Sequence, residues 1–264
     1  MPVERENSRA LVSLRNVGKI FPGGVRALQG LSLDIHRHEF VSLLGPSGCG
    51  KSTALRIVAG LTGETEGEVV WGDGTPARAR AGAIGFVFQE PTLMPWATVS
   101  GNVHQPLKLM GLSRSGAAQR IGESLDRVGL ADFANAYPRE LSGGMKMRVS
   151  IARALVTRPE LLLMDEPFAA LDEITRFRLN QDLLALWESM RGTVVFVTHS
   201  VFESVFLSRR ILVMTSRPGR VFEEIVIDTP YPRDEAFRTS ADYAAHCRRV
   251  SEALQAAMAA GGTL

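Results

Sequence analysis

Residues 45–53, Gly-Pro-Ser-Gly-Cys-Gly-Lys-Ser-Thr, place the tightest constraint on what this chain can fold into. They fit the pattern G-x-x-x-x-G-K-[ST], in which glycines let backbone N–H groups converge on phosphate oxygens. The apolar run Phe40–Leu44 precedes the pattern, and Thr53–Leu61 has the character of a helix closed by glycine. A strand, a glycine-rich turn and a helix start in this order form a cradle for phosphate. The alternative, a glycine-rich turn with an exposed lysine, does not require these flanking elements.

Two side chains in this loop have individual roles. Lys51 supplies a point charge to the β and γ phosphates of a nucleotide, and the Ser52 hydroxyl is placed to ligate Mg²⁺. The backbone of the whole stretch would contact the phosphates. The predicted nucleotide-binding residues here are Gly45, Pro46, Ser47, Gly48, Cys49, Gly50, Lys51, Ser52 and Thr53.

A pair of carboxylates follows a second apolar run. Leu161–Met164 predicts a buried strand, and Asp165 and Glu166 come directly after it, at the end of the strand where α/β sheets bind ligands. Asp165 would hold Mg²⁺, and Glu166 would orient and polarise an attacking water. An Asp-Glu pair alone is commonly a solvated turn, so this prediction depends on the phosphate-binding loop.

Strand-like and helical segments alternate along the chain, which predicts an α/β fold with a largely parallel sheet. From Val99 to about Val156 the apolar spacing is helical throughout, which indicates an inserted helical subdomain. We expect one domain over residues 11–230, with a core of 11–90 and 155–230 and a helical subdomain of about 91–154. A helical appendage, 231–264, follows.

A second candidate anion site lies inside the helical stretch. Ser142 is a good helix N-cap, and Gly143 and Gly144 leave backbone N–H groups without side-chain cover. A helix with an ordinary cap would be the better interpretation if this motif stood alone. Its position shortly before the strand that ends in Asp-Glu argues against that.

These features together resemble the ABC ATPase family. The resemblance covers about residues 11–226 and implies a P-loop NTPase (RecA-like) core with a mainly parallel sheet. It also implies an antiparallel β subdomain on the N-terminal side and the inserted helical subdomain. ATP, Mg²⁺ and a homodimer are implied as well. The motifs that occur in the family's order are the loop 45–53, Leu141–Gly144, Asp165–Glu166, Leu171-Asp172 and Thr198-His199.

Three roles follow from the resemblance for the nucleotide and the water. Phe21 would stack on adenine, Gln89 would sense the γ phosphate and the metal, and His199 would hydrogen-bond the γ phosphate and help position the water. The residues themselves leave other interpretations open. Phe21 could anchor a Pro-Gly-Gly turn in the core, Gln89 could be a surface amide, and His199 could simply start a helix.

The remaining roles concern the dimer. By resemblance, Ser142, Gly143 and Gly144 would grip the γ phosphate bound to the other subunit, and Asp172 would cross the interface. Met145 and Met147 depart from the glutamines usual in the family, although Met145 also occurs in the branch described next. Neither departure changes the backbone N–H groups that would bind phosphate.

Three segments resemble one branch of the family, the importers of nitrate, sulfonates, taurine and related small organic nutrients such as thiamine-precursor pyrimidines. They are residues 89–99, residues 197–204, and Met214 with Arg217-Pro218-Gly219-Arg220. Leu93, Met94 and Trp96 in the first would form an apolar cleft for a helix of a membrane partner, or else pack inside the helical subdomain.

The composition limits which partners, nucleic acid or membrane, the chain is expected to have. Lys and Arg number 30 against 28 Asp and Glu, so no basic surface for nucleic acid is expected. The sequence has no apolar run long enough to cross a bilayer, and Met1–Ala10 lacks the apolar core of a signal peptide. We therefore expect a soluble, cytoplasmic protein, and the resemblance implies a peripheral location on the cytoplasmic face of the inner (plasma) membrane. The resemblance implies separate transmembrane permease subunits and a periplasmic or extracellular substrate-binding protein.

Two rival functions use similar sequence features. A small-molecule kinase could carry the same phosphate-binding loop, but Leu141–Gly144 and His199 argue against it. An ABC protein of DNA repair or translation is the other rival. The single ATPase unit and the short chain between Lys51 and Asp165 argue against that.

Overall fold

The computed structural model describes residues 10–76, 80 and 82–261. The predicted absence of a signal peptide concerns residues 1–10, of which only Ala10 is described, and the last residues of the predicted appendage, 262–264, also lie outside this range. No helix within the described residues combines the length and the apolar character that a membrane crossing requires.

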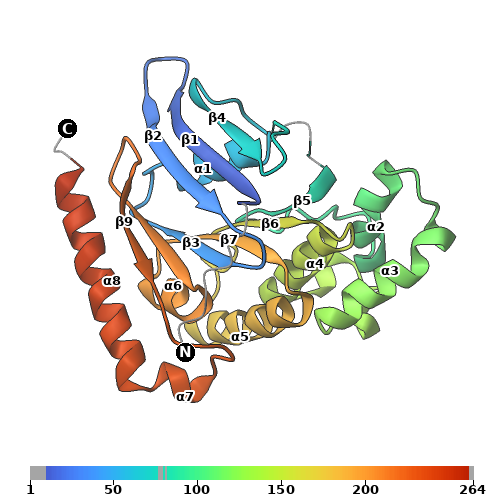
Figure 1. Cartoon of the computed structure of the whole chain (residues 1–264). Helices are drawn as coiled ribbons and strands as arrows, with labels where there is room; N and C mark the ends of the chain where they lie inside the picture. The colour runs from blue at the N-terminus through green and yellow to red at the C-terminus, as the bar shows by residue number, and fades with distance from the viewer. Residues whose placement is uncertain (1–9, 77–79, 81, 262–264) are drawn as a thin grey trace. The chain divides into compact units, whose positions relative to one another are not determined.

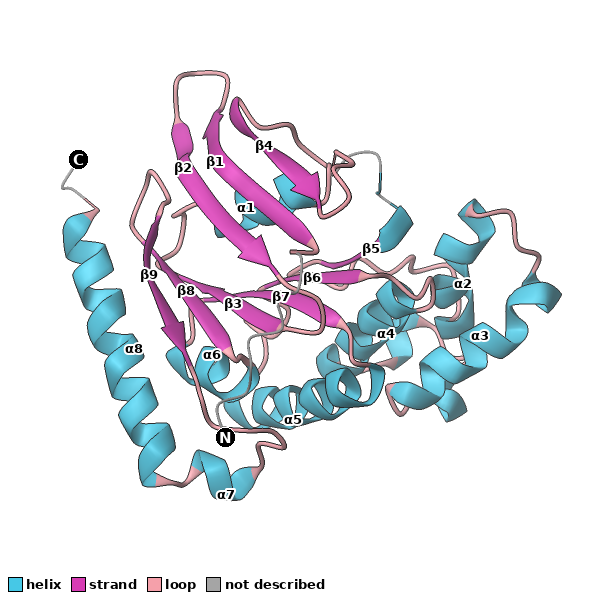
Figure 2. Cartoon of the chain, viewed as in Figure 1, coloured by secondary structure: helices cyan, strands magenta, loops and turns pink. Residues whose placement is uncertain are grey.

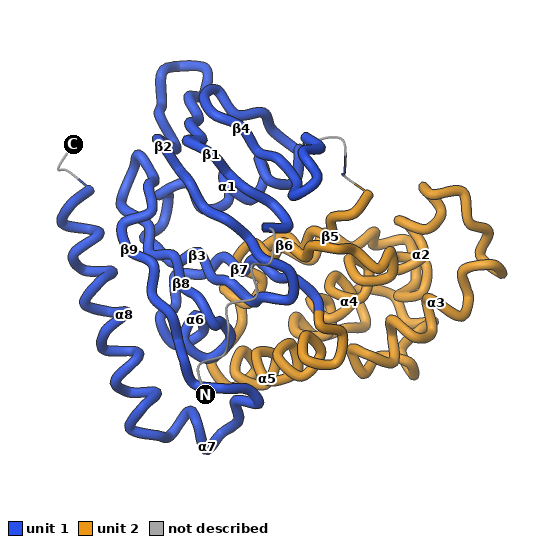
Figure 3. Tube along the Cα trace, in the orientation of Figure 1, with its two compact units in different colours: residues 1–81, 192–264 blue, residues 82–191 orange. Residues whose placement is uncertain are grey.

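The chain forms two compact units (Figure 3). One consists of residues 1–81 and 192–264, and the other of residues 82–191. The limits predicted for the helical subdomain, 91–154, and for the appendage, 231–264, stay predictions.

The first unit contains two sheets (Figure 2). In one, β1 lies between β2 and β4 and is antiparallel to both, which confirms the predicted antiparallel subdomain. In the other, β3 lies between β7 and β8 and is parallel to both, while β9 is antiparallel to β8. The strands are β1 (Val12–Ile20), β2 (Arg26–Ile35), β3 (Phe40–Leu44), β4 (Glu66–Trp71), β7 (Thr193–Thr198), β8 (Arg210–Met214) and β9 (Val221–Val226).

The helices of the first unit include the one that follows the phosphate-binding loop. They are α1 (Lys51–Val58), α6 (Val201–Leu207), α7 (Glu235–Arg238) and α8 (Ala241–Ala260). Helix α1 was predicted to run to Leu61, but Gly60 takes a left-handed φ of 70° and its N–H bonds the carbonyl of Ile57, which ends the helix earlier. Helix α8 packs on α6, β8 and β9 (Figure 1).

The second unit joins a parallel strand pair to a group of helices. Strand β5 (Ile84–Val87) is parallel to β6 (Leu161–Asp165), so the strand pairing is mainly parallel, as predicted. Helix α2 packs on α3 and α4, which confirms the inserted helical subdomain. Two short 3-10 helices, Ala131–Phe133 and Pro138–Glu140, join α3 to α4. The α-helices are α2 (Val99–Leu109), α3 (Arg114–Arg127), α4 (Gly143–Leu155) and α5 (Glu173–Met190).

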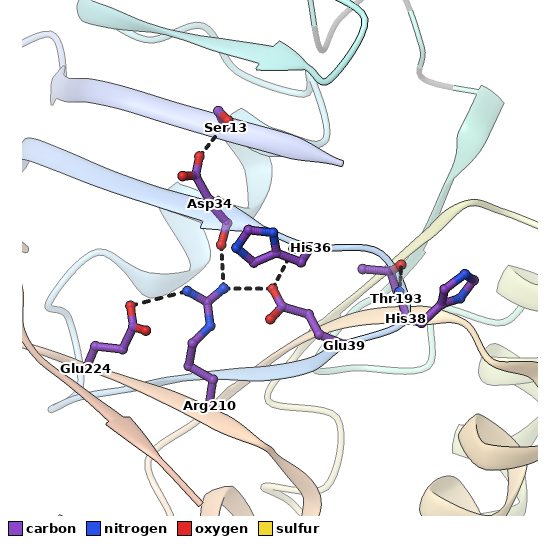
Figure 4. A network of polar contacts seen from close by, with 8 residues as sticks. All are labelled: Ser13, Asp34, His36, His38, Glu39, Thr193, Arg210 and Glu224. Atoms are coloured by element: carbon purple, nitrogen blue, oxygen red, sulfur yellow. Dashed lines mark hydrogen bonds and ion pairs between the residues drawn. The ribbon is translucent and has the colours of Figure 1, made fainter. Parts of the chain in front are cut away.

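A polar network joins the two sheets of the first unit (Figure 4). Arg210, at the start of β8, donates to Glu39 Oε1 at 2.7 Å, to Glu224 Oε2 at 3.2 Å and to the backbone carbonyl of Asp34. The Asp34 carboxylate in turn accepts from the Ser13 hydroxyl at 2.6 Å. Glu39 precedes β3, so the network holds the amino-terminal edge of the parallel strands, opposite the edge where the phosphate-binding loop emerges.

Candidate functional site

The phosphate-binding loop connects β3 to α1. Gly50 is the N-cap of α1, with φ 105° and no side-chain hydrogen bond at the cap. A Cβ atom at Gly50 would lie 2.7 Å from the carbonyl oxygen of Ala27, so both the backbone angle and the space require glycine. The first N–H groups of α1 are thus not taken by a capping side chain, which suits them to bind an anion.

Lys51 is buried along this loop, with only 4% of its surface exposed. Its Nζ donates to the backbone carbonyls of Gly45, at 2.8 Å, and of Pro46, at 3.0 Å. The ammonium is therefore held beside the loop backbone. Ser52 and Thr53 follow in the first turn of α1 and are half-buried.

The structure brings His199 to the same sheet edge. Leu44 pairs with Thr198 in parallel register, so the loop after β3 and His199 after β7 emerge side by side. His199 is exposed. The Thr198 hydroxyl donates to Glu203 Oε2 at 2.5 Å and accepts from the Ser200 N–H at 2.9 Å, which fixes the chain on both sides of His199.

Sequence reasoning missed the role of Thr198 and Glu203. The signal was present, because Ser200 and Glu203 have the S-x-x-E spacing of a capping box. Ser200 is the N-cap of α6 and accepts from the Glu203 N–H at 3.3 Å. The Glu203 carboxylate turns to Thr198, the residue before His199.

Phe21 lies in the turn between β1 and β2. Its N–H donates to the Val25 carbonyl at 2.9 Å, and its ring lies 5.4 Å from Lys19 Nζ. The side chain is 39% exposed, so it does not anchor the core. An exposed aromatic ring with a cation nearby can stack on a base.

In the second unit, three predicted residues emerge at one edge. Val87 pairs with Met164 in parallel register, so the two strands end at the same edge of the sheet. Gln89 follows β5 at this edge, Asp165 is the last residue of β6, and Glu166 comes directly after it. Gln89 is exposed and Asp165 is 6% exposed. Glu166 is half-buried and has a left-handed φ of 47°.

Helix α4 begins as the sequence predicts. Ser142 is its N-cap and accepts from the Met145 N–H at 3.3 Å. Ser142 and Gly143 are exposed, whereas Gly144 is buried against α5, so only the first two are openly accessible to a ligand. Met147, one of the two departures from the family pattern, is 3% exposed and serves as a core residue.

Asp172 caps α5 and is exposed. Its Oδ1 accepts from the Thr175 N–H at 2.9 Å, and this bond holds the pKa of the carboxyl below its usual value. Ile174, two residues on, is 77% exposed.

Arg153 of α4 is a further residue that sequence reasoning did not assign. Its guanidinium donates to the carbonyl of Pro91 at 2.8 Å, to the carbonyl of Thr92 at 2.9 Å and to the Thr92 hydroxyl at 2.9 Å. Burial lowers the pKa of Arg153. The guanidinium thus connects the helix that Ser142 caps to the loop that carries Gln89, a contact that no local sequence pattern reveals.

Comparisons with known proteins show which family the chain resembles. The ABC transporter family model matches residues 28–169. An uncharacterized ABC transporter ATP-binding protein of Methanocaldococcus jannaschii is 44% identical over 255 residues, covering 96% of this chain and 94% of the relative. The aliphatic sulfonates import ATP-binding protein of Bacillus cereus is 42% identical over 227 residues, covering 85% of this chain and 89% of the relative.

A solved structure shares the fold. The dimeric structure of an ATP-binding cassette in a post-hydrolysis state, bound to ADP and Pi, matches with a TM-score of 0.73 and 37% sequence identity. The match covers 83% of this chain and 100% of that one. With its phosphate-binding loop, its strand-end carboxylates and these relatives, the chain belongs to the ABC transporter family as an ATP-binding, ATP-hydrolysing subunit.

Proposed function

We propose that this chain powers the import of a small nutrient of the nitrate, sulfonate or taurine type. It would act as a homodimer on separate transmembrane permease subunits, at the cytoplasmic face of the plasma membrane, with a substrate-binding protein delivering the solute outside. The resemblance of residues 89–99 and 197–204 to importers of this branch supports the solute class. The name of the Bacillus cereus relative supports it as well.

One observation carries the dimeric mechanism: a single chain has two helix starts suited to anions. One is α1 with Gly50 and Lys51, and the other is α4 with Ser142 and Gly143. One nucleotide needs only one cradle. Two subunits facing each other head to tail would place Ser142 of one against the γ phosphate held by Lys51 of the other.

The residues divide the chemistry between them. Lys51 and the α1 N–H groups would bind the β and γ phosphates, and Phe21 would stack on adenine. Glu166 would accept a proton from the attacking water, and His199 would hydrogen-bond the γ phosphate and help position that water. Asp172 would lie at the interface between subunits.

The oxygen donors of the site fit Mg²⁺. This cation prefers hard oxygen ligands, and the predicted set consists of the Ser52 hydroxyl, the Gln89 amide and the Asp165 carboxylate. When bound with ATP, Mg²⁺ would neutralise charge on the phosphates. Asp165 is a buried carboxylate at a strand end, a position that a cation stabilises.

A mixed-dimer experiment tests the shared site. Lys51→Ala removes the positive charge that would bind the phosphates, and Ser142→Arg blocks the start of α4. Each homodimer should therefore lose both of its nucleotide sites. A mixed dimer keeps one intact site, formed by Lys51 of one subunit and Ser142 of the other. With Glu166→Gln in both chains to prevent hydrolysis, the mixture should trap up to one ATP per heterodimer.

Two controls make the result decisive. Differently tagged subunits show that heterodimers form, and each homodimer should trap essentially no ATP. Heterodimers that form but trap no nucleotide would show that the cradles do not act across a dimer.

A further inference from the structure

The turn between β8 and β9 is closed by its own hydrogen bonds. Thr215 N–H donates to the Arg220 carbonyl at 3.0 Å, its hydroxyl donates to the Pro218 carbonyl at 3.0 Å, and the same hydroxyl accepts from the Arg220 N–H at 3.1 Å. The turn therefore has a defined shape without help from Arg217, the residue between these bonds.

This turn lies directly against β2 and the phosphate-binding loop. Gly219 N–H donates to the Ala27 carbonyl at 2.9 Å, and the Gly219 carbonyl accepts from Gln29 N–H at 3.1 Å. A Cβ atom at Gly219 would lie 2.1 Å from the carbonyl oxygen of Cys49, so only glycine allows the approach. The loop thus rests on the turn, backbone against backbone.

Arg217 reaches from the turn to the outer side of the loop. Its Nε and Nη2 both donate to the carbonyl oxygen of Gly48, at 3.2 Å and 3.1 Å. In a trans peptide the C=O and the next N–H point in opposite directions. The Cys49 N–H therefore points away from Arg217, toward the Pro46 carbonyl at 3.4 Å, which also accepts from Lys51 Nζ.

We propose that Arg217 is a positioning residue for ATP binding: its guanidinium holds the Gly48 carbonyl on the far side of the peptide, so that the Cys49 N–H stays on the side of Lys51 and can turn from the Pro46 carbonyl to a bound phosphate. A peptide next to glycine rotates easily, because Gly48 has no Cβ to restrict it. An outward carbonyl also keeps its negative end away from an anion. The proposal rests on the proposed role of residues 45–53 in binding ATP.

A positioning role of this kind has a distinct kinetic signature. Arg217 contacts no reacting atom, so it should affect nucleotide affinity and KM and leave kcat at saturating ATP nearly unchanged. Because the turn is closed by Thr215 and by Gly219, loss of the guanidinium should leave the fold and its thermal stability nearly intact.

The test compares three variants of the full chain with the wild type. Arg217→Ala removes both bonds, and Arg217→Lys keeps the charge and one donor. Arg220→Ala is the matched control, because Arg220 is exposed in the same turn but its guanidinium donates to Gln29 instead of the loop. Titration with a fluorescent ATP analogue gives Kd, steady-state hydrolysis gives KM and kcat, and thermal unfolding gives Tm.

We expect Arg217→Ala to raise Kd and KM about fivefold to tenfold, the scale of one ordinary net hydrogen bond, with Arg217→Lys in between. Arg220→Ala should bind like the wild type. Equal Kd for Arg217→Ala and the wild type, or an equal loss in Arg220→Ala, would overturn the proposal. Loss of kcat at unchanged KM would do so too. Failure of the wild type to bind ATP would instead overturn the proposed function.

Discussion

Glu166 has an unusual backbone for a residue that is not glycine. Its left-handed φ of 47° follows directly after the buried Asp165 at the end of β6. Such a conformation costs about 1–3 kcal/mol and persists where surrounding structure imposes it, often at active sites. The strain therefore supports the assignment of Glu166 to the attacking water.

The substitution Glu166→Gln should separate binding from hydrolysis. The amide keeps the size of the side chain but cannot accept a proton, so turnover should fall at least about 100-fold. ATP affinity should stay within about twofold of the wild type, because other groups bind the phosphates. Turnover and nucleotide affinity are measured on the same preparation.

Glu252→Gln serves as the matched control, since Glu252 is an exposed glutamate on α8. It should leave both quantities unchanged. Full turnover in the Glu166 variant would remove this residue as the base.

At the scale of residues, the sequence predicts what is local. The loop 45–53 is a single continuous stretch of the chain, so its sequence pattern alone predicts phosphate binding. The roles of Arg153 and Arg217 could not be predicted, because their partners, the Thr92 and Gly48 carbonyls, lie far away in the chain. Backbone acceptors leave no mark in the sequence, so such contacts require the structure.

Among the elements, the attachment of α7 to the core depends on one buried cation. Arg233 is 4% exposed and lies between α6 and α7. Its guanidinium also makes cation–π contacts with the rings of Tyr231 and Phe237. Its guanidinium donates to carbonyls at the carboxyl end of α6 and beyond it. These acceptors belong to Val205, Phe206, Ser208, Ile227 and Thr229.

Arg233→Ala should lower the free energy of unfolding by about 2–4 kcal/mol, because it leaves several buried carbonyls without a donor. Denaturant unfolding measures this loss. Arg238→Ala, on the exposed side of α7, should cost less than about 0.5 kcal/mol. Equal stabilities of the two variants would show that the buried bonds of Arg233 are not needed.

The elements also differ in how well the sequence predicts them. Strands β3 and β7 are buried along their whole length, and most of their residues are apolar. Strands β4 and β9 were not predicted. Residues 66–68 of β4 are Glu-Gly-Glu and are exposed, and Glu223-Glu224 divides the apolar residues of β9, so neither sequence has an apolar run of full strand length. Hydrogen bonding of β4 to β1 and of β9 to β8 stabilises these strands, although their own sequences do not predict them.

For the whole molecule, the exposed Trp96 bears on assembly. It is 76% exposed, so it does not pack inside the helical subdomain. Large exposed aromatic residues are frequent anchors of interfaces. We expect a helix of the permease to cover it.

Trp96→Ala should weaken co-purification with the permease at least about tenfold and reduce transport, while ATP hydrolysis by the isolated subunit stays unchanged. Leu61→Ala is the control, since Leu61 is 60% exposed in the other compact unit. Assembly and transport equal to the wild type would show that no permease helix relies on Trp96.

The strand partners of β3 determine when its sheet can form during synthesis on the ribosome. Strand β3 emerges early, but both of its neighbours, β7 and β8, are translated only after the whole second unit. Until then its two edges have no native partner, and pairing over such sequence distances is slow. The turn that bears Arg217 emerges immediately after β8. A nascent chain can therefore acquire its ATP-binding cradle only near the end of translation, which exposes an unfinished sheet to chaperones for most of that time.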